Sequence, residues 1–131
     1  MGLKEFEEPF FSEFESEARG MTRVDVGISH LGDTQIFDVL LEAVRPDVVI
    51  EVGSWMGHSA NYIATKAKIL GLSPRVLCVD TFIGCWEHWC CTEFQGELQL
   101  VGGRPQVYAR FPTNVINAHN ADLFVPSGSI C

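Results

Sequence analysis

A short turn that follows an apolar run carries residue types suited to binding a small polar ligand. Glu51 lies within the apolar run of residues 48–52, and Gly53 and Gly57 follow it. Gly53 allows the backbone to turn tightly and approach a ligand, and Gly57 precedes a predicted helix whose first N–H groups are free. Asp80 ends the next apolar run, and a carboxylate accepts hydrogen bonds from ligand hydroxyl groups. The pattern predicts a small-ligand site.

Two common nucleotide-binding motifs do not fit this turn. Nicotinamide cofactors are typically bound by G-x-G-x-x-G, but Trp55 and His58 occupy the later glycine positions counted from Gly53. A P-loop requires Gly-Lys followed by Ser or Thr, and the sequence does not contain it. A different nucleotide binder that uses the same turn is kept as a weaker alternative.

The elements that position the turn alternate between strands and helices. We predict helices over residues 33–45, 58–70 and 105–119, strands over 48–52, 75–80 and 122–125, and a long connection over 81–104. In the first helix the spacing predicts one buried face, made of Ile36, Val39, Leu40, Ala43 and Val44. This order predicts an α/β fold: a Rossmann-like, doubly wound parallel sheet in three α/β/α layers, with ligands bound beyond the carboxyl ends of the strands.

The motif Glu51-x-Gly53-x-x-x-Gly57, with an acidic residue ending the next strand, resembles the class I S-adenosylmethionine-dependent methyltransferases. The resemblance implies that backbone groups around Gly53 hold the methionyl part of S-adenosylmethionine and that Glu51 orients it. It also implies that Asp80 binds the ribose, while Thr81 and Phe82 lie near the adenine. The implied cofactor-binding residues are Glu51, Gly53, Ser54, Gly57, Asp80, Thr81 and Phe82.

Two longer stretches extend the resemblance to a bacterial branch of proteins assigned as methyltransferases. They read Asp80-Thr81-Phe82-Ile83-Gly84-x-Trp86-Glu87-His88-Trp89 and Gly103-Arg104-Pro105-x-Val107-Tyr108-x-x-Phe111-x-x-Asn114-Val115. Glu87 and His88 are candidates for facing the substrate. The family fold has a seven-stranded sheet, whereas the sequence ends soon after the third predicted strand. The resemblance therefore implies the cofactor-binding half of a methyltransferase, with the methyl acceptor and the catalytic residues unassigned.

Charge and cysteine content exclude several other classes of protein. The 131 residues include 17 acidic and 9 basic ones, and the net charge of −8 disfavours binding to nucleic acid or to an anionic membrane. The N-terminus lacks the pattern of a signal peptide, so we expect a cytoplasmic protein with free thiols. Cys85, His88, Cys90 and Cys91 lie too close together in sequence to predict a zinc site, and we predict no metal.

The rival interpretation is a non-catalytic partner-binding or assembly module built on a degenerate Rossmann-like half-domain. Strand 48–52 contains no Lys or Pro to protect an exposed sheet edge. Phe6, Phe10 and Phe14 recur at helical spacing and predict an acidic aromatic helix over residues 1–20, ahead of the domain of residues 21–131. We therefore expect a homodimer or a longer parent chain.

Overall fold

The computed structural model describes residues 35–125 of the chain. The helix predicted over residues 1–20 lies outside the described residues, as do the first two residues of the helix predicted over 33–45. In chain order the elements are α2 (Gln35–Val44), β1 (Val48–Val52), α3 (His58–Ile69), β2 (Arg75–Val79), α4 (Trp86–Cys90), α5 (Thr92–Gln95), η2 (Gly96–Leu98), α6 (Val107–Asn117) and β3 (Phe124–Val125). The predicted α/β class is confirmed.

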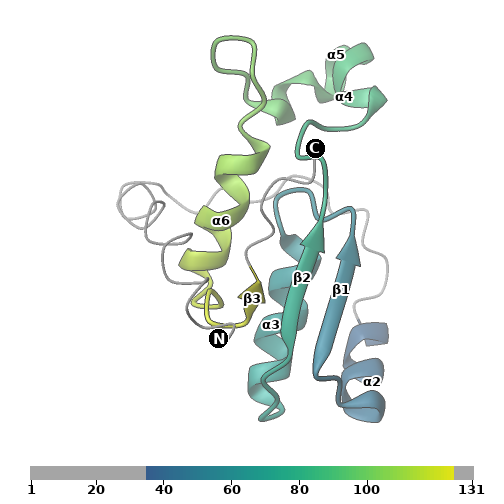
Figure 1. Cartoon of the computed structure of the whole chain (residues 1–131). Helices are drawn as coiled ribbons and strands as arrows, with labels where there is room; N and C mark the ends of the chain where they lie inside the picture. Colours follow the sequence, from purple (N-terminus) through teal and green to yellow (C-terminus); the bar gives the residue numbers. More distant parts are fainter. Residues whose placement is uncertain (1–34, 126–131) are drawn as a thin grey trace.

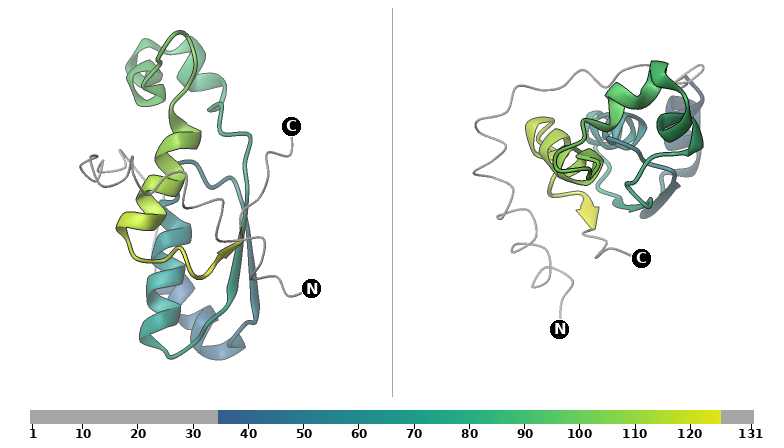
Figure 2. Two further views of the ribbon diagram at one scale, coloured as in Figure 1. Left: turned by 60° about the vertical axis from the view of Figure 1, so that its left-hand side comes forward. Right: turned by 90° about the horizontal axis from the view of Figure 1, so that it is seen from above.

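The three strands form one parallel sheet in the order β1-β2-β3. β1 and β2 pair along their full lengths, from Val48 opposite Arg75 to Val52 opposite Val79. β3 pairs with β2 through Phe124, which lies opposite Val76. The helices α3 and α6 connect successive strands and lie on the same side of the sheet (Figures 1 and 2). Both crossovers step in one direction across the sheet, and a uniform right-handed sense places both helices on one face.

The covered face of the sheet contains the main core. β2 contributes Val76 and Cys78, β3 contributes Phe124, and these side chains pack against small residues of α3 and apolar residues of α6. Ala60 and Ala64 are fully buried on α3, which permits a close approach of this helix to the strands. The covered face therefore has the dense packing expected beneath a crossover helix.

The opposite face of β1 is not covered by any of the residues 35–125. Val48, Ile50 and Val52 alternate along the strand and are 56%, 62% and 80% exposed. The predicted three-layer arrangement is therefore wrong for this part of the chain, which has two layers. A second helical layer requires the strand order to reverse beyond β1, and the described residues contain no strand on that side.

The burial predicted for the first helix is also wrong. Ile36, Val39, Leu40 and Val44 of α2 are all at least half exposed. The helix instead packs through Leu41, which joins Ile63 and Ala67 of α3 in a second small core. α2 lies beside β1 at the amino end of that strand and packs mainly on α3 (Figure 1). Its broad apolar face consequently points away from the core, and periodicity alone could not show which side a helix uses.

The connection over residues 81–104 contains three short helical segments that the sequence did not reveal. α4, α5 and η2 pack on one another beyond the carboxyl ends of β1 and β2 (Figure 1). α6 starts two residues later than predicted, at Val107, and runs through Pro112 without ending. None of the helices within residues 35–125 has the length and apolar character needed to cross a membrane.

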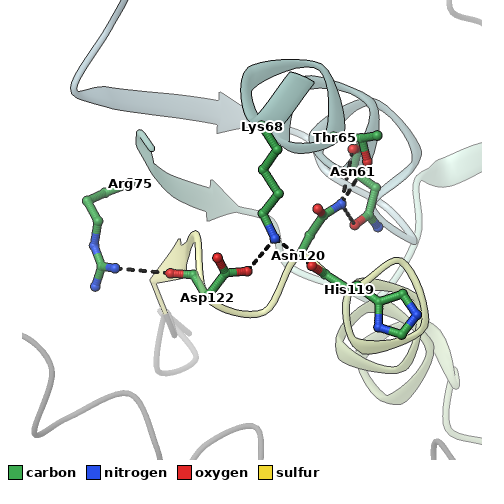
Figure 3. A network of polar contacts seen from close by, with 7 residues as sticks. All are labelled: Asn61, Thr65, Lys68, Arg75, His119, Asn120 and Asp122. Carbon is green, nitrogen blue, oxygen red and sulfur yellow. Dashed lines mark hydrogen bonds and ion pairs between the residues drawn. The ribbon is translucent and has the colours of Figure 1, made fainter. Parts of the chain in front are cut away.

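A polar network, here called the Asn120 network, ties α3 to the segment that precedes β3 (Figure 3). The buried Asn120 side chain donates to the Thr65 hydroxyl over 3.0 Å and to the Asn61 side-chain oxygen over 3.1 Å. Lys68 donates to the Asp122 carboxylate over 2.5 Å. These bonds join residues more than fifty positions apart and hold the segment before the third strand against α3, the first crossover helix.

Candidate functional site

The loops that follow β1 (residues 53–57) and β2 (residues 80–85) meet at the carboxyl edge of the sheet, and Asp80 joins them. The Gly53 N–H extends the strand pairing by donating to the Val79 carbonyl over 2.9 Å. One Asp80 carboxylate oxygen then accepts the Trp55 N–H, and the other accepts the Phe82 N–H, both over 2.7 Å. A single carboxylate thus fixes the backbone of both loops, and these bonds are strong because the acceptor is charged.

The two glycines of the turn have different physical roles. Both have φ of +84°, in the left-handed region that favours glycine. A Cβ at Gly53 would meet nothing within 4 Å, so the backbone there borders open space. A Cβ at Gly57 would lie 2.9 Å from the Phe111 ring, so Gly57 is required for the close packing of α3 on α6. Only Gly53 leaves room for a ligand beside its backbone.

Ser54 and Asn114 complete the polar groups around this turn. The Gly57 N–H donates to the Ser54 carbonyl over 2.7 Å, which closes the turn. Asn114 of α6 donates to the Met56 carbonyl over 2.9 Å. The Ser54 hydroxyl and the Asn114 side-chain oxygen are buried and have no hydrogen-bond partner among the described residues. Unsatisfied buried polar atoms are rare, and they mark places where a further partner fits.

Glu51 is engaged on the inner face of the sheet. The Ser59 hydroxyl, in the first turn of α3, donates to one of its carboxylate oxygens. The Cys78 thiol lies 3.8 Å from the other. Burial, and then the negative charge of Glu51, raise the pKa of Cys78 to about 12, so this thiol is protonated and inert at neutral pH. Glu51 therefore anchors the start of α3 from within the fold.

Thr81 and Phe82, the residues expected near an adenine, lie in different environments. Thr81 is exposed. The Phe82 ring is buried, with its centre 5.4 Å from that of Tyr108 and 5.2 Å from that of Phe111. Phe82 also has φ of +55°, which its short hydrogen bond to Asp80 helps to maintain. The Phe82 ring packs in the core, whereas the Phe82 backbone is part of the loop that follows β2.

The candidate substrate-facing residues lie on α4, beyond the strand ends. His88 stacks on Trp55, with ring centres 4.3 Å apart and planes 20° from parallel. The sequence did not reveal this contact, which joins α4 to the glycine turn across more than thirty positions. Glu87 is exposed on the same helix. Trp55 therefore connects the two halves of the candidate site: its N–H is held by Asp80, and its ring supports His88.

Within residues 35–125, no cluster of three or more His, Cys, Asp or Glu side chains has an arrangement that could hold a metal ion. The four cysteines of this part of the chain are free thiols, as predicted. Comparisons of the chain with models of protein families, with curated proteins and with solved structures find no match. Evidence about function therefore comes from the residues and their geometry.

Proposed function

We propose that this chain binds S-adenosylmethionine at the carboxyl edge of its sheet and forms the cofactor-binding half of a methyltransferase with a Rossmann-like fold. The observation that carries the proposal is the Asp80 clamp, which fixes the loops after β1 and β2 side by side. In a parallel α/β sheet this edge is where ligands bind. The β1-β2-β3 order, with both crossover helices on one face, is consistent with half of a doubly wound sheet.

The residues at this edge are compatible with the polar groups of the cofactor. The backbone at Gly53 borders open space, so an amino-acid moiety can approach it. The buried Ser54 hydroxyl has an unused hydrogen-bonding capacity. Each Asp80 oxygen accepts one backbone N–H and keeps a second lone pair, which suits the two hydroxyl groups of a ribose.

When bound, the cofactor supplies a sulfonium-activated methyl group to a nucleophile. The chain itself binds and orients the cofactor. In this proposal Asp80 holds the ribose, and the backbone around Gly53 holds the methionyl part. Glu51 acts as a positioning residue, because both of its oxygens already face protein groups and its bond to Ser59 fixes the first turn of α3. The methyl acceptor is unassigned.

Ligand-induced stabilisation tests the proposal directly. Thermal unfolding and calorimetry are carried out with S-adenosylmethionine, its demethylated product and NAD in parallel. A ligand at a hundred times its dissociation constant stabilises the fold by about 2.7 kcal/mol. We expect this gain with the first two ligands and its loss in Asp80→Asn. Asp122→Asn, which removes an exposed carboxylate of the Asn120 network, is the matched control and should keep the gain.

Three outcomes would contradict the proposal. The absence of any shift with S-adenosylmethionine and its product at millimolar concentration would favour the non-catalytic partner-binding module. An equal or larger shift with NAD would favour a different nucleotide binder that uses the same turn. A gain that survives Asp80→Asn would show that Asp80 does not hold the cofactor.

We further propose that the uncovered face of β1 is buried against a second copy of the chain. Val48, Ile50 and Val52 are three apolar side chains on one exposed strand face, and such surface usually marks an interface. Sedimentation and light scattering at low micromolar concentration should show a dimer, and Ile50→Lys should dissociate it. Ile69→Lys, at an equally exposed position on α3, is the control. A cooperative monomer would contradict this proposal.

A further inference from the structure

Cys85, His88 and Glu97 form a relay of side chains at the outer end of the molecule. Cys85 immediately precedes α4, His88 lies within α4, and Glu97 lies in η2. The Cys85 Sγ is 2.9 Å from the Nδ1 atom of His88. The Nε2 atom of the same imidazole is 3.4 Å from a carboxylate oxygen of Glu97. The thiol thus lies beside one nitrogen of the imidazole, and the carboxylate lies beside the other nitrogen.

The hydrogen bonds of the backbone determine which imidazole nitrogen carries the proton. The Cys85 backbone N–H donates to the His88 Nδ1 over 3.1 Å, so Nδ1 must present its lone pair. The neutral imidazole therefore carries its proton on Nε2, the atom that faces Glu97. In this tautomer the unprotonated nitrogen is the one that the thiol contacts, and the Cys85 backbone N–H must release its single lone pair before that nitrogen can take the thiol proton.

Packing holds the imidazole in this position. The Trp55 ring stacks on it, and the His88 side chain is 15% exposed. Gly84 sets the path of the preceding loop: its φ is +83°, and a Cβ there would lie 2.6 Å from the Leu98 side chain. The backbone bond from Cys85 to His88 is also a helix-capping contact, but capping does not account for the Glu97 carboxylate or for the Trp55 stack.

The thiol itself is accessible and protonated. Cys85 is exposed. A hydrogen bond with Glu87, followed by burial, raises the pKa of the Cys85 thiol above its ordinary value. A thiolate is therefore not preformed, and rapid reaction requires a base that takes the proton as the sulfur attacks. Cys90, which is also exposed and free, serves as an internal reference.

We propose that Cys85, His88 and Glu97 constitute a base-assisted nucleophile for small electrophiles whose saturated carbon carries a leaving group. The Cys85 sulfur attacks the carbon, the S–C bond forms, and the leaving group departs with the electron pair of the broken bond. The thiol proton moves to His88 Nδ1 and then to solvent. The Glu97 carboxylate, at ion-pair distance from Nε2, stabilises the transient imidazolium. This proposal does not depend on S-adenosylmethionine binding.

Iodoacetamide is the probe, since it forms a stable thioether and releases iodide. The full-length protein is labelled at neutral pH for increasing times, quenched and unfolded, and the remaining thiols are blocked with a second reagent. Cleavage after glutamate cuts at Glu87 and separates Cys85 from Cys90, and fragmentation of the two peptides distinguishes Cys85 from Cys78 and Cys90 from Cys91, so tandem mass spectrometry follows each site in one sample. General-base assistance predicts that Cys85 reacts roughly 10²-fold faster than Cys90. Without assistance, the raised pKa of the Cys85 thiol predicts slow labelling of Cys85.

Matched variants distinguish base assistance from exposure. His88→Asn keeps an acceptor for the Cys85 backbone N–H but removes the base, and it should lower the Cys85 rate to that of Cys90. Glu97→Gln keeps the size of the side chain and removes its charge. It should lower the Cys85 labelling rate about tenfold, because His88 becomes a weaker base. In both variants the Cys90 rate should be unchanged, and circular dichroism should show a native fold.

Three results would overturn the proposal. One is a Cys85 rate that does not exceed that of Cys90 in the unmodified protein. Another is a folded His88→Asn variant with an undiminished Cys85 rate. If His88→Asn does not fold, the wild-type protein still decides, because proton transfer to His88 makes the Cys85 reaction slower in heavy water. A Cys85 rate that is not slowed in heavy water would show that no base takes part.

Discussion

The carboxyl edge and the Asn120 network are both polar regions beside the sheet, but their polar side chains have different kinds of partner. In the Asn120 network the Lys68 ammonium meets the Asp122 carboxylate, and the Asn120 amide meets acceptors on α3 (Figure 3). At the carboxyl edge, Asp80 bonds two backbone N–H groups of two loops. There, the Ser54 hydroxyl is buried without a partner among the described residues.

The difference separates a structural region from a candidate site. Polar groups that pair with one another across distant elements stabilise the arrangement of those elements. At the carboxyl edge, the carboxylate that fixes the loops still has free acceptor capacity, and a buried hydroxyl and exposed backbone lie beside it. Such an arrangement of unpaired polar groups suits the binding of a ligand. Variants at the Asn120 network should therefore change stability alone, whereas variants at the carboxyl edge should also change binding.

The largest effect is expected at the glycine turn of the carboxyl edge. Gly57→Ala combines a left-handed φ of +84° with a methyl group 2.9 Å from the Phe111 ring, and we expect a loss of about 3 kcal/mol in unfolding free energy. Gly53→Ala has the same φ and open space, so its cost should be about 1 kcal/mol. Urea unfolding measures both. Equal losses would show that packing on Phe111 does not distinguish the two glycines.

Asn120→Ala tests the structural region. The change removes a buried amide and leaves the acceptors of Asn61 and Thr65 without this donor, which should cost about 2 kcal/mol. Asn117→Ala, at the end of the neighbouring helix α6, should change stability by less than about 0.5 kcal/mol. The labelling rate of Cys85 relative to Cys90 should stay unchanged in both. A changed ratio would mean that the two regions are coupled.

Asp80→Asn tests the carboxyl edge, the other region of the comparison. The amide keeps one acceptor oxygen but turns a donor toward one of the two backbone N–H groups, and about 1 kcal/mol of stability should be lost without ligand. Thermal melts with and without S-adenosylmethionine then separate two effects. A loss of stability with full retention of ligand-induced stabilisation would make Asp80 a purely structural residue.

Lys68→Met should have the smallest effect. The Lys68–Asp122 pair is solvent-exposed, and such pairs contribute about 0.5 kcal/mol or less. The aliphatic part of the side chain is retained in the variant, so the measured difference reports the charge. Urea unfolding at low and high salt should give a difference that shrinks as salt increases. A loss above about 2 kcal/mol would show that the pair is coupled to the buried Asn120 amide.

Local patterns in the sequence predicted the first two strands and the main crossover helix closely, whereas the strand predicted over 122–125 is only Phe124–Val125. The strand predicted over residues 48–52 has those bounds in the structure, and the helix predicted over 58–70 is α3 (His58–Ile69). Runs of β-branched residues, a glycine at each end of α3 and the proline after α2 act within a few residues. The spacing of the glycine turn from Asp80 also placed both at the same edge of the sheet, since parallel strands share their carboxyl ends.

Features that depend on which elements pack against each other were predicted less well. The apolar face of α2 was expected to be buried, but Leu41 contacts the core and Val39 and Leu40 do not. Periodicity shows that a helix has an apolar side, whereas burial requires another element to lie against it. The second helical layer fails for the same reason, because the described residues supply no strand beyond β1.

The sequence by itself determined the alternation of strands and long helices, the parallel α/β class and the residue types at the carboxyl edge. Tertiary structure decided what those residues contact: Asp80 holds the Trp55 N–H, Trp55 stacks on His88, and His88 lies between Cys85 and Glu97. Helix and strand formation depend on neighbours in sequence. A hydrogen bond or a ring stack between residues thirty positions apart depends on how the whole chain packs, and no local pattern encodes it.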